Sequence, residues 1–148
     1  MPKAHEIVEL DLLTLRSLTE QAGDIMDAEL WQKAIEVSLP MSEVASVRRD
    51  GALIAYAMLQ PKKDGLWFVT GFNTHPDYRN AFVFRSLFAQ IIGIASRRKI
   101  ISLQSNVYRS NRLSLAFHMR LGFHMTQESE KAIEFTATIA ELLAKHGR

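Results

Sequence analysis

Residues 71–90, GFNTHPDYRNAFVFRSLFAQ, contain the strand-to-helix transition that decides the fold. An extended apolar stretch ends before Pro76, a short turn carries Arg79, and apolar residues at helical spacing begin near Ala81. The first-turn N–H groups of a helix have no intrahelical partners, and the helix dipole adds to their positive field. This stretch therefore predicts a binding site for an anion at the start of the helix.

The apolar pattern on either side of this stretch predicts a sheet with helices packed on it. Strands are expected at residues 6–10, 43–49, 52–59, 66–74, 100–107, 123–128 and 131–138. Helices are expected at residues 11–26, 27–37, from 81 to the cations at 97–99, at 111–121 with Ser110 as its cap, and at 139–146.

The connections between these elements indicate a mixed α/β sheet. Asp50-Gly51 and Asp64-Gly65 are hairpin turns that join three consecutive strands into an antiparallel meander. The strand, helix and strand between residues 66 and 107 need a right-handed crossover, which makes that strand pair parallel. We find no linker or repeat, so we expect a single domain over residues 1–148.

Composition excludes several classes of protein. The chain has 148 residues, of which 47% are apolar and 23% charged, and it has no uncharged apolar run of about eighteen residues. It has no cysteine, which excludes disulfides, thiolate metal sites and cysteine nucleophiles. Its start, MPKAHEIVELD, lacks the apolar core of a signal peptide, so we expect a cytoplasmic protein without membrane contact.

The net charge of +2 hides a strong asymmetry along the chain. Residues 78–127 contain eight lysines and arginines and no acidic residue, whereas the rest of the chain has ten against all sixteen acids. A ligand with phosphates should approach this basic block through long-range attraction as well as contact. A nucleic-acid surface is the less favoured alternative, because the block lacks interleaved aromatic stacking residues and any reading motif.

The sequence resembles the GNAT family of N-acetyltransferases at two motifs. The family's pyrophosphate motif reads V-x-P-x-Y-R/Q-x-x-G-x-G/A, and Thr74, Pro76, Tyr78 and Arg79 match it. In SNVYRSNRLSLAFHMRLGF, residues 105–123, five positions match the second family pattern, N-x-x-A/S-x-x-hydrophobic-Y-x-x-x-G-F: Asn111, Ser114, Phe117, Gly122 and Phe123. The resemblance implies the acyl-CoA N-acyltransferase fold, a twisted and mostly antiparallel sheet with a central parallel strand pair and helices on both faces.

The resemblance also implies where acetyl-CoA would bind as co-substrate, with no metal. The implied residues are Phe72, Asn73, Thr74, Arg79, Asn80, Ala81, Phe82, Val83, Phe84, Arg85, Asn111, Ser114 and Phe117. Phe82 and Phe84 stand where the family has glycines, which let phosphate oxygens approach backbone N–H groups. Their rings either point into the core, fill the pyrophosphate site, or shift the site toward another acyl donor. The second case would leave a degenerate domain without its cofactor.

By the same resemblance, the function is transfer of an acetyl group from acetyl-CoA to a primary amine by direct attack. The family's tyrosine general acid corresponds to His118, with Tyr108 as the spare candidate, and His75 is the one titratable side chain available as a base near the strand 66–74. Each of the three also has a purely structural interpretation. His118 could simply lie on a helix face, Tyr108 could be a packed aromatic residue, and His75 could be part of a turn. We expect the acceptor to be a small-molecule or peptide amine. The oligomeric state is left open, with a homodimer as one option because dimers are common among similar proteins.

Overall fold

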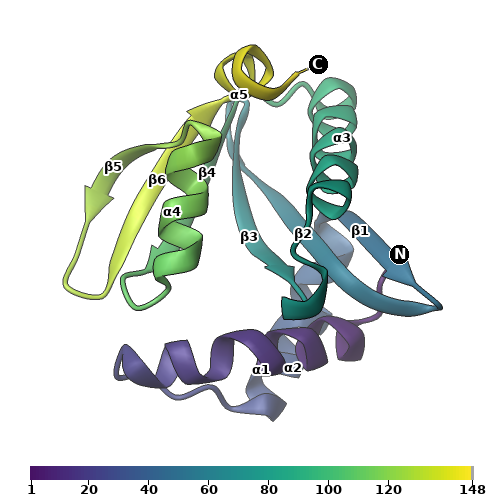
Figure 1. Cartoon of the computed structure of the whole chain (residues 1–148), viewed down its shortest axis with the longest axis vertical. Coiled ribbons are helices and arrows are strands. Elements are labelled where there is room, and N and C mark those ends of the chain that lie inside the picture. The colour runs from purple at the N-terminus through teal and green to yellow at the C-terminus, as the bar shows by residue number, and fades with distance from the viewer. Residues whose placement is uncertain (148) are drawn as a thin grey trace.

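The computed structural model describes residues 1–147, which form one six-stranded sheet with five α-helices (Figure 1). The helices are α1 (Ala4–Gln21), α2 (Ala28–Ser38), α3 (Ala81–Arg98), α4 (Arg112–Leu121) and α5 (Ile139–His146), with short 3₁₀ turns at η1 (Leu39–Met41) and η2 (Pro76–Tyr78). The strands are β1 (Glu43–Arg49), β2 (Ala52–Lys63), β3 (Leu66–Thr74), β4 (Ser102–Tyr108), β5 (His124–Glu128) and β6 (Ala132–Thr138).

The strand order confirms the fold class expected from the sequence. The order is β1-β2-β3-β4-β6-β5, and every neighbouring pair is antiparallel except β3 and β4. Alternate residues of β2 belong to two separate cores, because successive side chains of a strand point to opposite faces. Ala55 and Ala57 pack in the core that includes α3, whereas Tyr56 and Met58 pack with α1 and α2. Helices therefore cover both faces of the sheet.

The predicted strand at residues 6–10 is wrong, because this stretch is the beginning of α1. Ile7, Leu10 and Asp11 are buried on one face of the helix, and this helical spacing continues the apolar pattern of the residues that follow. The backbone N–H of Lys3, the residue before the helix, donates to the carboxylate of Glu6 (2.9 Å), which gives this N–H group a hydrogen-bond acceptor. A short stretch with alternating polar residues could not distinguish a strand from the first turns of a longer helix.

We expect replacement of Glu6 by glutamine to remove a pH-dependent contribution to stability. Arg48, at 2.6 Å, and the Lys3 backbone lower the pKa of Glu6 from 4.5 to about 2. A lowered folded-state pKa stabilises the protein above pH 4.5, and this contribution is lost as the pH falls toward 2. Solvent screening should hold the loss in Glu6→Gln to under about 1 kcal/mol at pH 7. Urea unfolding of both proteins at pH 7 and pH 2.5 measures it, and an equal difference at both pH values would contradict the assignment.

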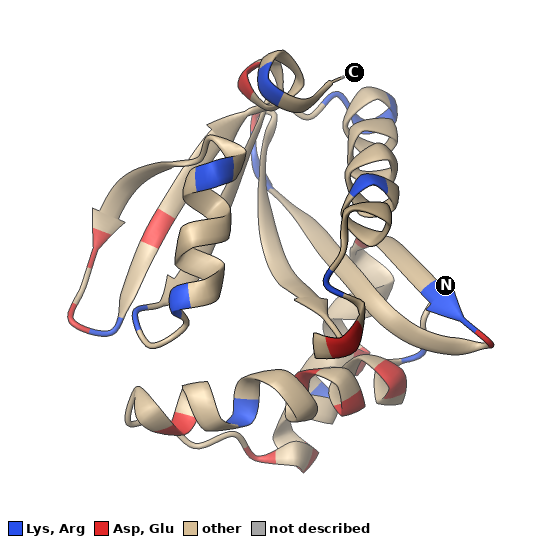
Figure 2. Cartoon of the chain, in the orientation of Figure 1, with Lys and Arg blue, Asp and Glu red and all other residues tan. Residues whose placement is uncertain are grey.

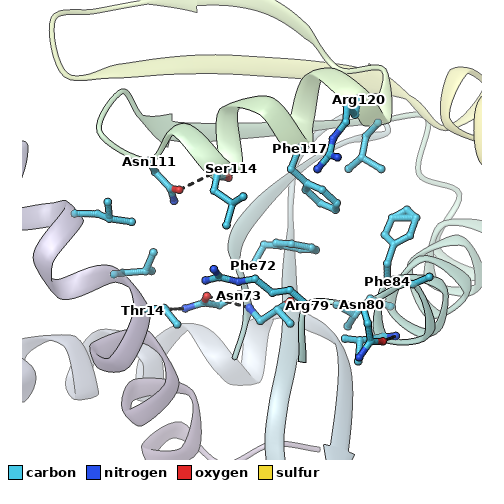
Figure 3. Close-up of a pocket in the computed structure, with 18 of the residues that line it drawn as sticks. Thr14, Phe72, Asn73, Arg79, Asn80, Phe84, Asn111, Ser114, Phe117 and Arg120 are labelled. Carbon is cyan, nitrogen blue, oxygen red and sulfur yellow. Dashed lines mark hydrogen bonds between the residues drawn. The ribbon is translucent and has the colours of Figure 1, made fainter. Parts of the chain in front are cut away.

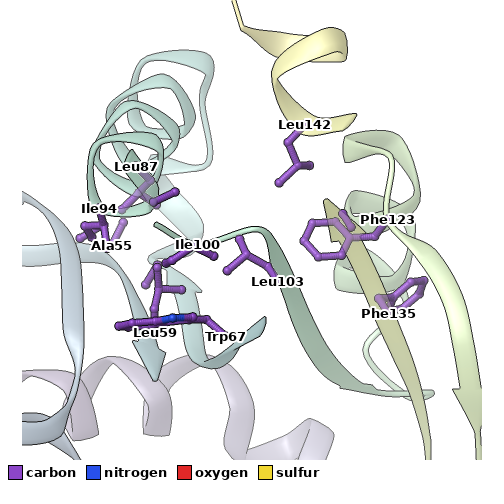
Figure 4. Packing of buried hydrophobic residues seen from close by; sticks show 14 of the residues in the cluster. Ala55, Leu59, Trp67, Leu87, Ile94, Ile100, Leu103, Phe123, Phe135 and Leu142 are labelled. Carbon is purple, nitrogen blue, oxygen red and sulfur yellow. The ribbon is translucent and has the colours of Figure 1, made fainter. Parts of the chain in front are cut away.

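The main core holds α3 against the sheet and so fixes the position of its N-terminus (Figure 4). Leu87 and Ile94 of α3 pack among buried residues of β2, including Leu59, and Leu103 of β4 continues the same core toward Phe135 of β6. Because this packing fixes the helix axis, the first turn of α3 lies beside the end of β3 (Figure 1).

The two parallel strands separate halfway along their length. β3 pairs with β4 only over Leu66–Val69, opposite residues 102–105. Beyond this point β3 stays paired with β2 as far as Thr74, and β4 stays paired with β6 as far as Tyr108. The sheet therefore opens into a V between the ends of β3 and β4 (Figure 1).

The edge strand β1 has a side-chain partner on α3. The N–H of Ser46 donates to the Gln90 side-chain oxygen (2.9 Å), and the Gln90 side-chain nitrogen donates to the Ser46 carbonyl (2.8 Å). One primary amide thus satisfies both backbone groups of this residue.

Candidate active site

A cavity of about 440 Å³ lies where the sheet opens, between the end of β3, the start of α3, the face of α4 and one side of α1 (Figure 3). Eleven of the thirteen residues expected at the cofactor line it: Phe72, Asn73, Thr74, Arg79, Asn80, Ala81, Val83, Phe84, Asn111, Ser114 and Phe117. The other two, Phe82 and Arg85, do not line it. The two motifs are thus brought together across one opening, although about thirty residues separate them in the chain.

The N-terminus of α3 presents free backbone donors beside the cavity. The Asn80 side chain caps the helix by accepting from the N–H of Val83 (3.0 Å), and the Asn80 carbonyl accepts from Phe84 (3.1 Å). Over residues 1–147, the N–H groups of Ala81 and Phe82 have no acceptor in the protein. These two N–H groups can therefore hold an anion at this end, and Arg79, which also lines the cavity, adds a positive charge to it.

Phe82 and Phe84 leave this helix end accessible. The side chain of Phe82 is 69% exposed and does not line the cavity. Phe84 is half-buried and lies against Phe117 of α4, with ring centroids 5.7 Å apart, and Phe117 stacks on Phe72 of β3 at 5.6 Å. The three rings form a wall between the open cavity and a smaller apolar one of about 50 Å³. Neither ring removes the free N–H groups at the start of α3, which are backbone groups.

His118 lies on the other side of this wall. It is buried, stacks on Phe135 (5.1 Å), and lines the small apolar cavity instead of the large one. Its Nδ1 lies 2.8 Å from the carbonyl of Ser114 and its Nε2 lies 3.1 Å from the hydroxyl of Ser105. Burial lowers the pKa of this imidazole, which favours the neutral form. Its role as a general acid stays a prediction that this position does not support.

Tyr108 and His75 are also outside the cavity lining. The hydroxyl of Tyr108 donates to Asp24 in the α1–α2 connection (2.9 Å), and Lys131 donates to the other oxygen of this carboxylate (2.7 Å). Burial, together with Asp24, raises the pKa of Tyr108. His75 accepts from the backbone N–H of Asp77 (3.1 Å) and so shapes the turn. Tyr108 and His75 therefore have the structural surroundings of a packed residue and a turn residue, respectively.

The helix cap predicted at Ser110 is wrong, because Asn111 is the cap of α4. The Asn111 side chain accepts from the N–H of Ser114 (3.1 Å). The Ser110 hydroxyl instead donates to the carbonyl of Leu18 at the end of α1 (2.9 Å). Ser110 therefore helps to close the V by connecting α4 to α1.

Sequence reasoning missed eight further residues of the cavity lining: Thr14, Leu15, Leu18, Leu87, Leu113, Arg120, Leu121 and His146. The first three lie on α1, whose packing across the V is a long-range contact without a local sequence signal. Arg120 belongs to the acid-free block, which was the one available signal for it. His146 donates from Nε2 to the carbonyl of Leu121 (3.1 Å) and packs edge-on against Phe84.

This geometry, a split parallel pair beside a helix N-terminus, is that of the acyl-CoA N-acyltransferase fold. The sequence profile of the Acetyltransferase (GNAT) family matches residues 7–123. The chain belongs to this family. A search of curated protein sequences gave no match.

Solved structures of acetyltransferases share the fold. The PaiA N-acetyltransferase from Thermoplasma acidophilum, in complex with coenzyme A, is 14% identical with a TM-score of 0.71, over 92% of each chain. A GNAT-family acetyltransferase from Staphylococcus aureus Mu50 is 11% identical with a TM-score of 0.73, also over 92% of each chain. The ribosomal-protein-alanine N-acetyltransferase from Brucella melitensis is 19% identical with a TM-score of 0.63, over 92% of this chain and 93% of that one. Within the described residues of this protein, no helix is both long and apolar enough to cross a membrane.

Proposed function

We propose that this protein transfers an acetyl group from acetyl-CoA to a primary amine of a small molecule or peptide. The observation that carries the proposal is the cavity of about 440 Å³ between the separated strands, with unpaired N–H groups at one end and Arg79 in its lining. An opening of this kind fits a long ligand that has an anionic group at one end and an apolar arm. Membership of the family supports the same assignment.

The residues at the start of α3 would hold the pyrophosphate of the donor. The free N–H groups of Ala81 and Phe82 can donate to phosphate oxygens, and the Arg79 guanidinium adds charge. The end of β3 is not paired with β4 beyond Val69, so backbone groups there are available to orient the arm of the donor. The rings of Phe72 and Phe117 would exclude water from this arm.

Acetyl-CoA supplies an activated thioester, which a neutral amine attacks so that a C–N bond forms, the C–S bond breaks and CoA leaves as the thiol. A direct reaction is favoured because the chain has no cysteine to form an acyl-enzyme. The proton lost by the amine goes to solvent and the thiolate is protonated from solvent, since none of the three candidate acid and base residues lines the cavity.

Calorimetric titration with acetyl-CoA, CoA and a longer acyl-CoA tests the proposal directly. Micromolar binding of acetyl-CoA is expected, followed by thiol release in an amine screen of alkylamines, diamines, amino-acid amides and short peptides. Tighter binding of the longer acyl-CoA would instead favour another donor, consistent with the extra aromatic ring of Phe84 in the cavity wall. If none of the three binds, the protein is a degenerate member of the family and the proposal fails.

Two arginines near the start of α3 provide a matched pair of variants. Arg79 lines the cavity, whereas Arg85, six residues further along the chain, is exposed and does not. Loss of one charge-assisted hydrogen bond to phosphate should raise the Kd for acetyl-CoA about tenfold in Arg79→Gln. Arg85→Gln should stay within about twofold of the parent protein at the same ionic strength. Equal effects of the two variants would show that only the general positive charge matters.

A further inference from the structure

A buried carboxylate lies behind the cavity wall at the end that faces α1. Thr14 of α1 and Asn73 of β3 line the cavity there, and Asp11 lies directly behind both of them. The side-chain nitrogen of Asn73 donates to Asp11 (3.2 Å) and to the hydroxyl of Thr14, as Figure 3 shows for the latter pair. The Asp11 residue has no exposed surface.

Asp11 accepts hydrogen bonds from neutral donors alone. Besides Asn73, it accepts from the hydroxyl of Tyr56 (2.6 Å) and from the indole nitrogen of Trp31 (2.8 Å). Among the described residues, no lysine, arginine or histidine nitrogen lies within 4 Å of its oxygens. Buried carboxylates usually have a cationic partner, so this one is unusual.

The hydrogen bonds favour the ionised form of Asp11. The indole N–H of Trp31 and the side-chain NH2 of Asn73 can only donate, and the 2.6 Å contact with the Tyr56 hydroxyl has the length of an O–H donor to a carboxylate. Burial raises the pKa of Asp11 above its usual value, and the donors from Tyr56, Trp31 and Asn73 offset only part of this rise. An ionised carboxylate without a counter-ion places a negative potential on the adjacent end of the cavity.

The helices around the cavity differ in the sign of their charge, and the acidic one is the helix that contains Asp11 (Figure 2). α3 and α4 carry arginines and no acidic residue, whereas α1 carries four acids, Glu6, Glu9, Asp11 and Glu20, against one arginine, Arg16. α3 and α4 therefore form a basic side of the cavity and α1 an acidic side, with the Arg79 side chain extending between them toward Asn73 (Figure 3). The basic side is the one that suits the phosphates of the donor.

We propose that Asp11 determines acceptor specificity, by making the α1 end of the cavity a subsite for a cationic amine carried on an apolar body. The inference rests on the proposed function. Thr14 and Asn73 would contact the ammonium group, while Leu15, Leu18 and Leu113 would contact the apolar body. Because the carboxylate attracts the ammonium form, which must lose a proton before it reacts, the benefit lies in binding and not in the chemical step. Asp11 itself does not touch the acceptor.

Binding of a cation and of its neutral analogue to Asp11→Asn tests this inference. Phenethylamine is cationic at pH 7 and 2-phenylethanol is not, and each is titrated into the full-length protein with CoA present, so that no turnover occurs. The parent protein should bind the amine at least about tenfold more tightly than the alcohol. In Asp11→Asn this ratio should fall close to one, while the Kd for CoA changes less than about twofold. In turnover assays, KM for the amine should rise with little change in kcat.

Two further variants separate charge from structure. Trp31→Phe removes one hydrogen bond to the same carboxylate but keeps its charge, so the preference for the amine should persist. Thr14→Lys, at a half-buried position on the cavity wall, should abolish the preference while the alcohol and CoA still bind, and it replaces Asp11→Asn if that variant does not fold. An unchanged ratio in a folded Asp11→Asn, or failure of the parent protein to prefer phenethylamine, overturns the inference. Binding of acetyl-CoA in either case would leave the proposed function standing.

Discussion

A glutamate at position 81 is expected to weaken acetyl-CoA binding about a hundredfold while leaving the fold intact. Ala81 is the first residue of α3, is exposed, and lines the cavity beside the free N–H groups. A carboxylate at this position would interact with the same donors as the pyrophosphate and would repel it. The same carboxylate should stabilise the helix by about 0.3–1 kcal/mol, because it lies at the positive end of the helix dipole.

The control for this variant is Ala89→Glu, which adds the same charge to an exposed position of α3 away from the cavity. Its Kd for acetyl-CoA should stay within about twofold of the parent value at physiological ionic strength. Calorimetry gives the Kd values, and thermal unfolding gives the stabilities. Tight binding by Ala81→Glu would place the phosphates elsewhere and would remove the main support for the donor site proposed here.

The second large effect concerns Gly71, which lies in β3 next to the ring of Tyr56. A Cβ atom at this position would lie 2.8 Å from the Tyr56 Cε2 atom and 2.9 Å from its hydroxyl oxygen. The ring is 1% exposed and bonded to Asp11, so it has no room to move without losing this hydrogen bond. Gly71→Ala should therefore lower the free energy of unfolding by about 2–4 kcal/mol, through overpacking and a buried polar group left without a partner.

The same substitution at Gly93 should have the opposite sign. Gly93 lies inside α3, is exposed, and an added Cβ would meet no atom within 4 Å. Alanine there should stabilise the protein by about 0.5–1 kcal/mol, because it is the better helix former. Urea unfolding of both variants measures the two effects. A Gly71→Ala protein as stable as the parent would mean that the Tyr56 ring moves more easily than its burial indicates.

The sequence predicted the parts of the fold that depend on local patterns. Hairpin turns, the strand-to-helix transition before Ala81 and the crossover between β3 and β4 were all visible, and together they determine the topology. The N-terminal strand was predicted wrongly because a few residues of α1 alternate by chance. The V between β3 and β4 could not be predicted from local patterns, since the loss of pairing after Val69 leaves no pattern in either strand.

The candidate site was predictable where it follows the chain and not where it depends on contacts across space. Asn80, Phe84 and Asn111 were found because motif positions identify them. Asp11 was missed, because a polar residue within a helical pattern is typical of an exposed surface. Only its hydrogen bond from Tyr56, a residue far away in the chain, shows that it is buried for a reason. His118 shows the reverse, since its motif position suggested catalysis and its packing against Phe135 puts it behind the aromatic wall.

The amide of Gln90 has a consequence for assembly. Its two hydrogen bonds to Ser46 occupy two of the backbone groups that another strand would need in order to extend the sheet at β1. A second copy of the chain could not add there without displacing this side chain from α3. All five residues of the far edge strand, β5, are exposed, so a dimer formed through a continuous sheet would join more readily at that end of the molecule.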